Sequence, residues 1–217
     1  MVNEVLGHDE STASVYYPEI VMCLSAAVGT DTSVVSEAIA SELRIVGYIP
    51  IAIRLSSLMA QIPGLEYLSE LKAEDERISE SMRAGNEIRR IIGHANAVAR
   101  LALSEIHRIR ASLNESEDVT VPAERHCFII SSLKRDEELE MLRKLFGQRA
   151  LLISVYEPRE QRMENLCRKI ASSKNSADPE AHKDIANGLI DTDQKERSNL
   201  LGQRLEDVFA GGFSSGK

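Results

Sequence analysis

Residues 19–47 read EIVMCLSAAVGTDTSVVSEAIASELRIVG, and this stretch decides the fold. The apolar run at 19–26 predicts a buried strand. The segment 32–47 predicts a helix, because apolar residues recur there at three-to-four spacing: Val35, Ile39, Leu43 and Val46. Gly47 is typical of a helix end. A strand, a short turn of small residues and a helix form a frame that binds phosphate, since the helix N-terminus offers unpaired N–H groups.

The turn within this frame lacks most of what a working P-loop needs. Aligned with G-x-x-x-x-G-K-[ST], it has Ala26 and Asp31 at the glycines, Thr32 at the lysine and Ser33 at the hydroxyl. A carboxylate near a γ-phosphate and a missing lysine both oppose phosphoryl transfer, so kinase or ATPase activity is not expected. Two interpretations stay open for the loop. Either Asp31 or Thr32 caps the helix, or the loop is a weakened phosphate site in which Ser33 could also contact Mg²⁺, formed by Gly29, Thr30, Asp31, Thr32 and Ser33.

Outside this stretch, short apolar runs alternate with amphipathic ones. Strands are predicted at 48–56, 124–133 and 149–156, and helices at 134–147 and 158–173, the latter with Pro158 at its first position. Residues 56–110 are almost all helical, broken by a Pro-Gly pair and by Gly93, and a last helical region ends near Phe209. Pro50 places the second strand at a sheet edge. The pattern predicts a helix-rich α/β fold in which a parallel sheet is flanked by helices on both faces.

Ligands of such sheets bind at the carboxyl ends of the strands, which directs attention to 25–33, 54–58, 131–136 and 156–162. Several polar and cationic side chains follow the third and fourth strands: Ser131, Ser132, Lys134, Arg135, Arg159 and Arg162. Each alone is typical of a solvated surface. Their shared place at strand ends makes them candidate phosphate-binding residues.

The helical stretch 81–94 carries a further cationic cluster. Its apolar stripe consists of Ile78, Met82, Gly85 and Ile92. Arg89 falls in the middle of the stripe, with Arg83, Asn86 and Arg90 to one side. A buried arginine needs a partner. Arg89 is therefore either paired with Glu76, Glu80 or Glu87, or directed with Arg83 and Asn86 at a ligand phosphate or base.

The composition limits the function further. A net charge of -8 does not indicate a nucleic-acid-binding protein, although nucleic acid could still be a regulator. The 3 cysteines are far apart and predict buried thiols in a reducing cytoplasm. The first residues show no signal peptide, and no apolar run reaches the ~20 residues that span a membrane. The histidines have no metal-binding spacing, and neither H-x-E nor P-C-x-x-C of the zinc deaminases is present.

Three blocks, VGTD, MRAGNEIRR and SLKRDEELEMLRKLFG, resemble the P-loop-kinase-like N-terminal half of bacterial anti-phage dCTP/dCMP deaminases. More distantly, the layout is similar to nucleoside-monophosphate and dephospho-coenzyme A kinases. The resemblance implies a P-loop NTPase fold, and the domain that carries it is expected at 19–209, between a flexible leader at 1–18 and a flexible tail at 210–217. In that family a zinc-dependent deaminase half follows, and its motifs are absent from this chain.

The resemblance favours a nucleotide-recognising, regulatory or assembly domain of an anti-phage deoxycytidylate deaminase system, without deaminase activity in this chain. The expected ligand is a nucleotide, for example a deoxynucleotide bound together with Mg²⁺. The expected protein partner is a deaminase domain or a second copy of the chain. An unfinished sheet edge would suit a homo-oligomer. The alternatives are a kinase-like phosphotransferase, in which Arg83, Arg89 or Arg162 replaces the lysine, and a scaffold that binds no ligand.

Overall fold

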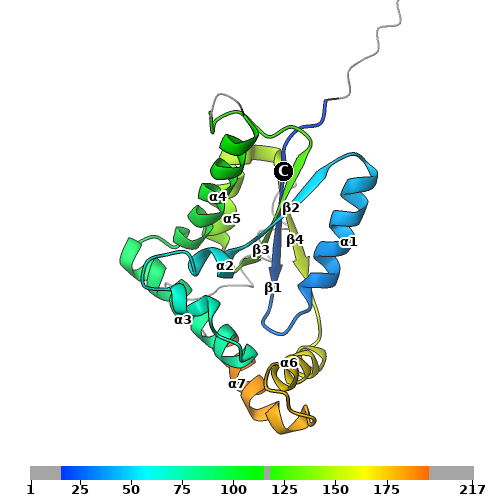
Figure 1. The fold of residues 1–217 in the computed structure, drawn as a ribbon, viewed down its shortest axis with the longest axis vertical. Helices are drawn as coiled ribbons and strands as arrows, with labels where there is room; N and C mark the ends of the chain where they lie inside the picture. The colour runs from blue at the N-terminus through cyan, green and yellow to red at the C-terminus, as the bar shows by residue number, and fades with distance from the viewer. Residues whose placement is uncertain (1–15, 115–117, 196–217) are drawn as a thin grey trace, which may run out of the picture.

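The computed structural model describes residues 16–114 and 118–195. Its centre is a parallel sheet of four strands in the order β2-β3-β1-β4 (Figure 1). The strands are β1 (Ile20–Ala26), β2 (Ile49–Arg54), β3 (His126–Leu133) and β4 (Ala150–Val155). All four predicted strands are confirmed, and β2, which contains Pro50, lies at an edge as expected.

Helices lie on both faces of the sheet. They are α1 (Thr32–Ile45), α2 (Leu55–Met59), α3 (Glu74–Ile92), α4 (Ala97–Leu113), α5 (Asp136–Phe146), α6 (Arg159–Ser173) and α7 (Lys183–Lys195), with short 3-10 turns η1 (Glu66–Ser69), η2 (Gly147–Arg149) and η3 (Glu180–His182). Figure 1 shows α1 on one side of the sheet, α4 and α5 on the other, and α6 and α7 beyond the arrowheads of the strands. The predicted class, a helix-rich α/β fold in which a parallel sheet is flanked by helices, is confirmed by this arrangement.

Among the described residues, three apolar clusters stabilise the fold. The largest packs Val21, Cys23 and Phe128 of the sheet against α2, α3, α4 and α5. A second packs the opposite face, with Leu24 and Ile129, against α1. The third lies away from the sheet and joins α6 and α7 to Met82 of α3. The layer of α6 and α7 is therefore held by its own small core.

The strand order produces a switch point beside β1. The chain leaves β1 through α1 towards β2 and leaves β3 through α5 towards β4, so these two connections lie on opposite faces of the sheet. A crevice opens at the carboxyl ends where such connections diverge. A β-bulge lies at the same place: Leu24 pairs with Ser131 and Ser25 with Leu133, and the additional residue Ser132 has a φ of 76°.

Some local expectations need correction. Ile92, assigned to the apolar stripe of its helix, is 46% exposed, because the helix ends at Gly93 in the left-handed conformation. Pro158 is the cap of α6, one residue before the first helical position. The expected helix end near Phe209, the tail and most of the leader fall outside the described residues. Within those residues, no helix is both long and apolar enough to cross a bilayer.

The three cysteines are buried and free, as predicted. Burial raises the pKa of Cys23 and of Cys127 to about 12, and it also raises the pKa of Cys167. Since the thiolate is the reactive form, we expect iodoacetamide at pH 8 to leave the native protein unmodified for hours and to modify all 3 thiols after unfolding in guanidinium. Intact-mass spectrometry measures both states. Rapid labelling of the native chain would contradict the buried thiols.

Candidate functional site

A cleft of about 1200 Å³ opens at the carboxyl ends of β1, β2 and β3. One wall is the loop between β1 and α1, and the others come from α2, η1, α3 and α6. Apolar side chains of α2, η1 and α3 form part of its lining: Leu55, Met59, Leu68, Ile78 and Met82. The cleft therefore has enough volume for a small molecule, and its lining is partly apolar and partly polar.

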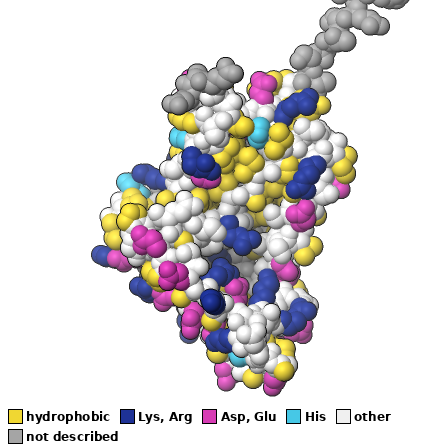
Figure 2. Space-filling model, in the orientation of Figure 1, with side chains coloured by type: hydrophobic (Ala, Val, Ile, Leu, Met, Phe, Trp, Pro, Cys, Tyr) yellow, Lys and Arg dark blue, Asp and Glu magenta, His cyan; other side chains and the backbone are white. Residues whose placement is uncertain are grey.

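Cationic side chains dominate the charge of the cleft. Among the described residues that line it are Arg54, Arg77, Arg89, Lys134, Arg168 and Lys169, against only Asp31 and Glu74. Figure 2 shows Lys and Arg side chains gathered near the centre of the visible face, between α3 and α6. Four of these six cations form ion pairs with described carboxylates, so the positive excess comes from Arg54 and Arg168. In a chain with a net charge of -8, this local excess favours an anionic ligand.

The β1–α1 loop ends in a helix cap. The Asp31 carboxylate accepts hydrogen bonds from the Ser33 backbone N–H at 3.3 Å and from the Ser33 hydroxyl at 2.5 Å. The hydroxyl bond, followed by the charge of Lys169, holds the pKa of Asp31 below its ordinary value. The capping interpretation of Asp31 is thus correct. Ser33, expected as a phosphate or Mg²⁺ contact, donates its hydroxyl proton within the protein.

Contacts from two helices hold the remainder of the loop. Arg162 of α6 donates to the Val28 carbonyl at 3.0 Å, and Asn165 donates to the Gly29 carbonyl at 3.2 Å. Asp193 of α7 accepts from the Val28 N–H at 2.9 Å. Gly29 has a φ of 92°, and a Cβ there would lie 2.6 Å from the Arg162 carbonyl oxygen. The loop therefore depends on a glycine for both its conformation and its close approach to α6.

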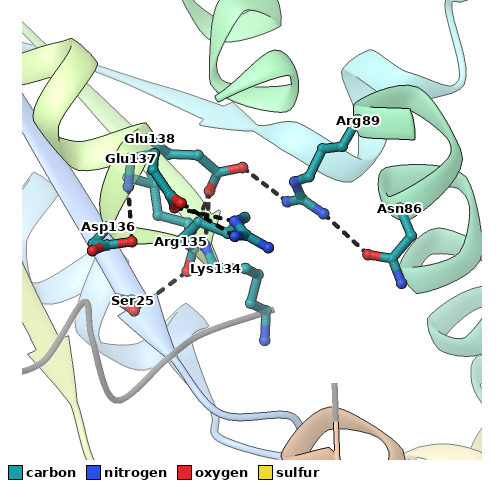
Figure 3. A network of polar contacts seen from close by, with 9 residues as sticks. Ser25, Asn86, Arg89, Lys134, Arg135, Asp136, Glu137 and Glu138 are labelled. Atoms are coloured by element: carbon teal, nitrogen blue, oxygen red, sulfur yellow. Dashed lines mark hydrogen bonds and ion pairs between the residues drawn. The ribbon is translucent and has the colours of Figure 1, made fainter. Parts of the chain in front are cut away.

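Arg89 lies at the cleft and is 2% exposed. Its guanidinium donates to Glu138 of α5 at 2.8 Å and to Asn86 at 3.3 Å (Figure 3). The expectation of a carboxylate partner is confirmed, but the partner is Glu138, 49 residues along the chain, instead of Glu76, Glu80 or Glu87. The Arg89 Nε–H is buried and has no hydrogen-bond partner among the described residues.

The other candidate residues of α3 do not point into the cleft. Arg83 is exposed, donates to Glu80 at 2.9 Å and to the Tyr67 hydroxyl at 2.8 Å, and lines a shallow groove between α3 and α7 together with Asn86. Only Arg89 of this cluster lines the cleft. Arg83 is therefore not placed to replace the missing lysine.

The candidate arginines after β3 and β4 are held within the protein. Arg135 is fully buried, and hydrogen bonds from it outweigh the effect of burial on Glu137, lowering the pKa of that carboxyl to about 2. Arg159 pairs with Asp191 of α7 at 2.7 Å. Arg162 is 6% exposed, and its guanidinium donates to the Val28 carbonyl of the β1–α1 loop. None of the three is among the residues that line the cleft.

Of the sequence-based candidates, the cleft contains the whole loop from Gly29 to Ser33, with Arg89 and the strand-end residues Ser131, Ser132 and Lys134. The sequence interpretation missed four cations: Arg54, Arg77, Arg168 and Lys169. Arg54 is the last residue of β2 and lies in 54–58, one of the segments expected at the ligand-binding edge of the sheet. Its side chain has no ion-pair partner among the described residues. Arg168 and Lys169 lie farther into α6, and helical periodicity from Arg162 and Asn165 would have placed them on the loop side.

The arrangement suits binding better than phosphoryl transfer. Thr32 occupies the position at which a P-loop has its lysine. The lowered pKa of the loop carboxylate Asp31 keeps it ionised at neutral pH. Lys134 brings an ammonium group beside the loop, 3.0 Å from the Ala26 carbonyl. Among the described residues, no cluster of three or more His, Cys, Asp or Glu side chains could hold a metal ion.

Comparison with known proteins leaves the ligand open. No protein-family model matches the chain, and no curated protein sequence matches it significantly. Among solved structures, the chain is similar to a gluconokinase from Sinorhizobium meliloti 1021, with a TM-score of 0.37 and 15% sequence identity over 91% of each chain. With identity this low, the ligand has to be inferred from the cleft itself.

Proposed function

We propose that this chain recognises a phosphate-bearing small molecule, of which a nucleotide is the best fit, and does not transfer the phosphoryl group. The observation that carries the proposal is the cleft at the strand ends, where cations outnumber carboxylates in an acidic protein. Its apolar lining from α2, η1 and α3 suits a base or another planar group, and its many serines suit sugar hydroxyls.

Binding is tested by thermal shift and calorimetry with nucleoside monophosphates, nucleoside triphosphates and inorganic tripolyphosphate, each with and without Mg²⁺. Ribo- and deoxynucleotides are compared in parallel. Stabilisation by at least one phosphorylated compound, but not by its nucleoside, is the expected result. If no compound stabilises the protein, the proposal is wrong and the chain is a scaffold.

Arg54→Ala should weaken binding about tenfold, since a hydrogen bond to a charged group contributes roughly 1.5 kcal/mol. Arg54 is the informative choice because its guanidinium holds no other described side chain, so its removal leaves the fold intact. Arg44→Ala is the matched control: Arg44 is exposed on α1, pairs with Glu37 and does not line the cleft. Equal affinities of the two variants would show that the ligand binds elsewhere.

A kinase-like phosphotransferase is the second candidate, and the position of Lys134 favours it. The Lys134 ammonium group lies beside the β1–α1 loop and is part of the cleft, so it is the cation best placed to replace a P-loop lysine. This function requires Mg²⁺-dependent turnover that Lys134→Met abolishes. A coupled assay for ADP formation over a panel of acceptors separates it from pure recognition.

The resemblance to anti-phage deoxycytidylate deaminases supports a further proposal, that recognition serves a deaminase partner or a second copy of this chain. In the described part of the chain, β4 is an edge strand without charged residues or proline, and such an edge suits pairing with another strand. Mass photometry with and without deoxynucleotide tests assembly. Restored dCTP deamination on mixing with a separate zinc-deaminase domain would connect the chain to that system.

A further inference from the structure

A carboxylate near the end of α7 binds two parts of the cleft wall at once. Asp193 accepts the Val28 N–H of the loop at 2.9 Å through Oδ2 and the Lys134 ammonium at 3.3 Å through Oδ1. Val28 and Lys134 both line the cleft, whereas Asp193 does not. The two donors are thus drawn out of the cleft towards α7, and Figure 3 shows Lys134 pointing away from the pair of Arg89 and Glu138.

The burial of Asp193 makes these contacts strong. Its side chain is 1% exposed and that of Lys134 is 13% exposed, so the pair is shielded from solvent. A buried carboxylate is tolerated only when charge and hydrogen bonds compensate its lost hydration. Lys134 supplies the charge and Val28 a backbone donor. Asp193 therefore satisfies the same kinds of groups, an ammonium and a loop N–H, that a bound phosphate would require.

The support of α7 allows it to move separately from the sheet. Its buried residues Ala186, Leu189 and Ile190 pack on α6 and on Met82, in a cluster distinct from the two that hold the sheet. Val28 packs against this same cluster. A helix supported by a small local core opens at lower free energy than the central strands do. Movement of α7 would then release the loop and Lys134 together.

Resting on the proposed function, we infer that α7 is a latch on the cleft: Asp193 holds the Val28 N–H and Lys134 away from the ligand, and a phosphate-bearing ligand competes with Asp193 for them. Ligand binding weakens the hold of α7, and loosening of α7 strengthens ligand binding by the same factor, because coupling between two equilibria is reciprocal.

Asp193→Asn tests the latch, with tripolyphosphate and ATP as probes. The substitution keeps the side-chain shape and removes the charge that attracts Lys134. We expect binding about tenfold tighter than in the wild type, which corresponds to a typical coupling free energy. Asp191→Asn is the matched control, since it lies on the same helix, removes the same charge and pairs with Arg159 near the surface. Its affinity should equal that of the wild type.

The outcomes separate the latch from the proposed function. Equal or weaker affinity of Asp193→Asn relative to Asp191→Asn overturns the latch and leaves the proposed function standing, provided that both variants bind. Absence of binding in every variant overturns both. Asp193→Asn combined with Lys134→Met should lose the gain, and a retained gain would overturn the role of Lys134.

Hydrogen exchange of the wild-type protein provides a test that needs no substitution. Saturating tripolyphosphate should accelerate exchange of the amides in Lys183–Lys195 several-fold while it slows exchange in the β1–α1 loop. Unchanged or slower exchange in α7 upon binding would overturn the latch, whatever the stability of the Asp193 variants.

Discussion

Glu138→Ala is expected to lower the free energy of unfolding by about 3–5 kcal/mol, since removing one partner of a buried ion pair leaves the other charge uncompensated. Glu138 is fully buried and accepts hydrogen bonds from the Arg89 guanidinium at 2.8 Å and from the Lys134 backbone N–H at 2.9 Å. It therefore ties α3 to the start of α5, on the wall of the cleft. Urea unfolding followed by circular dichroism measures the loss.

Glu140→Ala on the same helix is the control for this substitution. Glu140 forms a surface pair with Lys144 at 3.7 Å, with 63% of its side chain exposed. Solvent screens such a pair, so a loss of about 0.5 kcal/mol or less is expected. Similar losses for the two variants would mean that the Arg89–Glu138 pair does not stabilise the fold.

Gly29→Ala should be the second most damaging substitution, with a loss of about 2–4 kcal/mol in the free energy of unfolding and a loss of ligand binding. Roughly 1–2 kcal/mol comes from forcing a side chain into the left-handed region, and a similar amount from overpacking. The overpacking arises because the new Cβ would lie 2.6 Å from the Arg162 carbonyl oxygen, which is backbone and cannot turn aside. Thermal unfolding and ligand titration measure the two effects.

Gly64→Ala isolates the contribution of the contact. Gly64 has a φ of 89°, close to the 92° of Gly29, but in the described structure no atom beyond its two chain neighbours lies within 4 Å of the position that its Cβ would occupy. The Gly64→Ala variant should lose only the free energy that the backbone strain costs, about 1–2 kcal/mol. Its ligand affinity should be normal. A loss at Gly29 no larger than that at Gly64 would contradict the close packing of the loop on α6.

The elements of the fold could be predicted because their signals are local. The apolar runs around Val21 and Phe128 mark buried strands, Pro50 marks an edge, and Gly93 marks a helix end. The site was harder to predict from the sequence, since its contacts join distant parts of the chain. Nothing in the spacing of Arg89 reveals Glu138 as its partner, because the pairing arises only when α3 and α5 pack on the same face of the sheet.

The same limit explains the candidates that the cleft does not contain. Arg135, Arg159 and Arg162 do follow strand ends, as their positions in the sequence indicate. Their side chains are nevertheless used inside the protein, on Glu137, Asp191 and the Val28 carbonyl. Position along the chain places a residue at the correct edge of the sheet, whereas the direction of its side chain depends on neighbours that only the tertiary structure defines.

The bulge in β3 lets two core residues at an odd spacing share one face of the sheet. Ile130 and Leu133, three residues apart, both pack in the large cluster, which regular alternation along a strand would not allow; Ser132 supplies the offset. Deleting Ser132 would leave Ile130 and Leu133 two residues apart, and a regular strand keeps such residues on the same face. The bulge is therefore not needed to bury Leu133, and a protein without Ser132 is expected to keep its core while losing the local bend at the carboxyl end of β3.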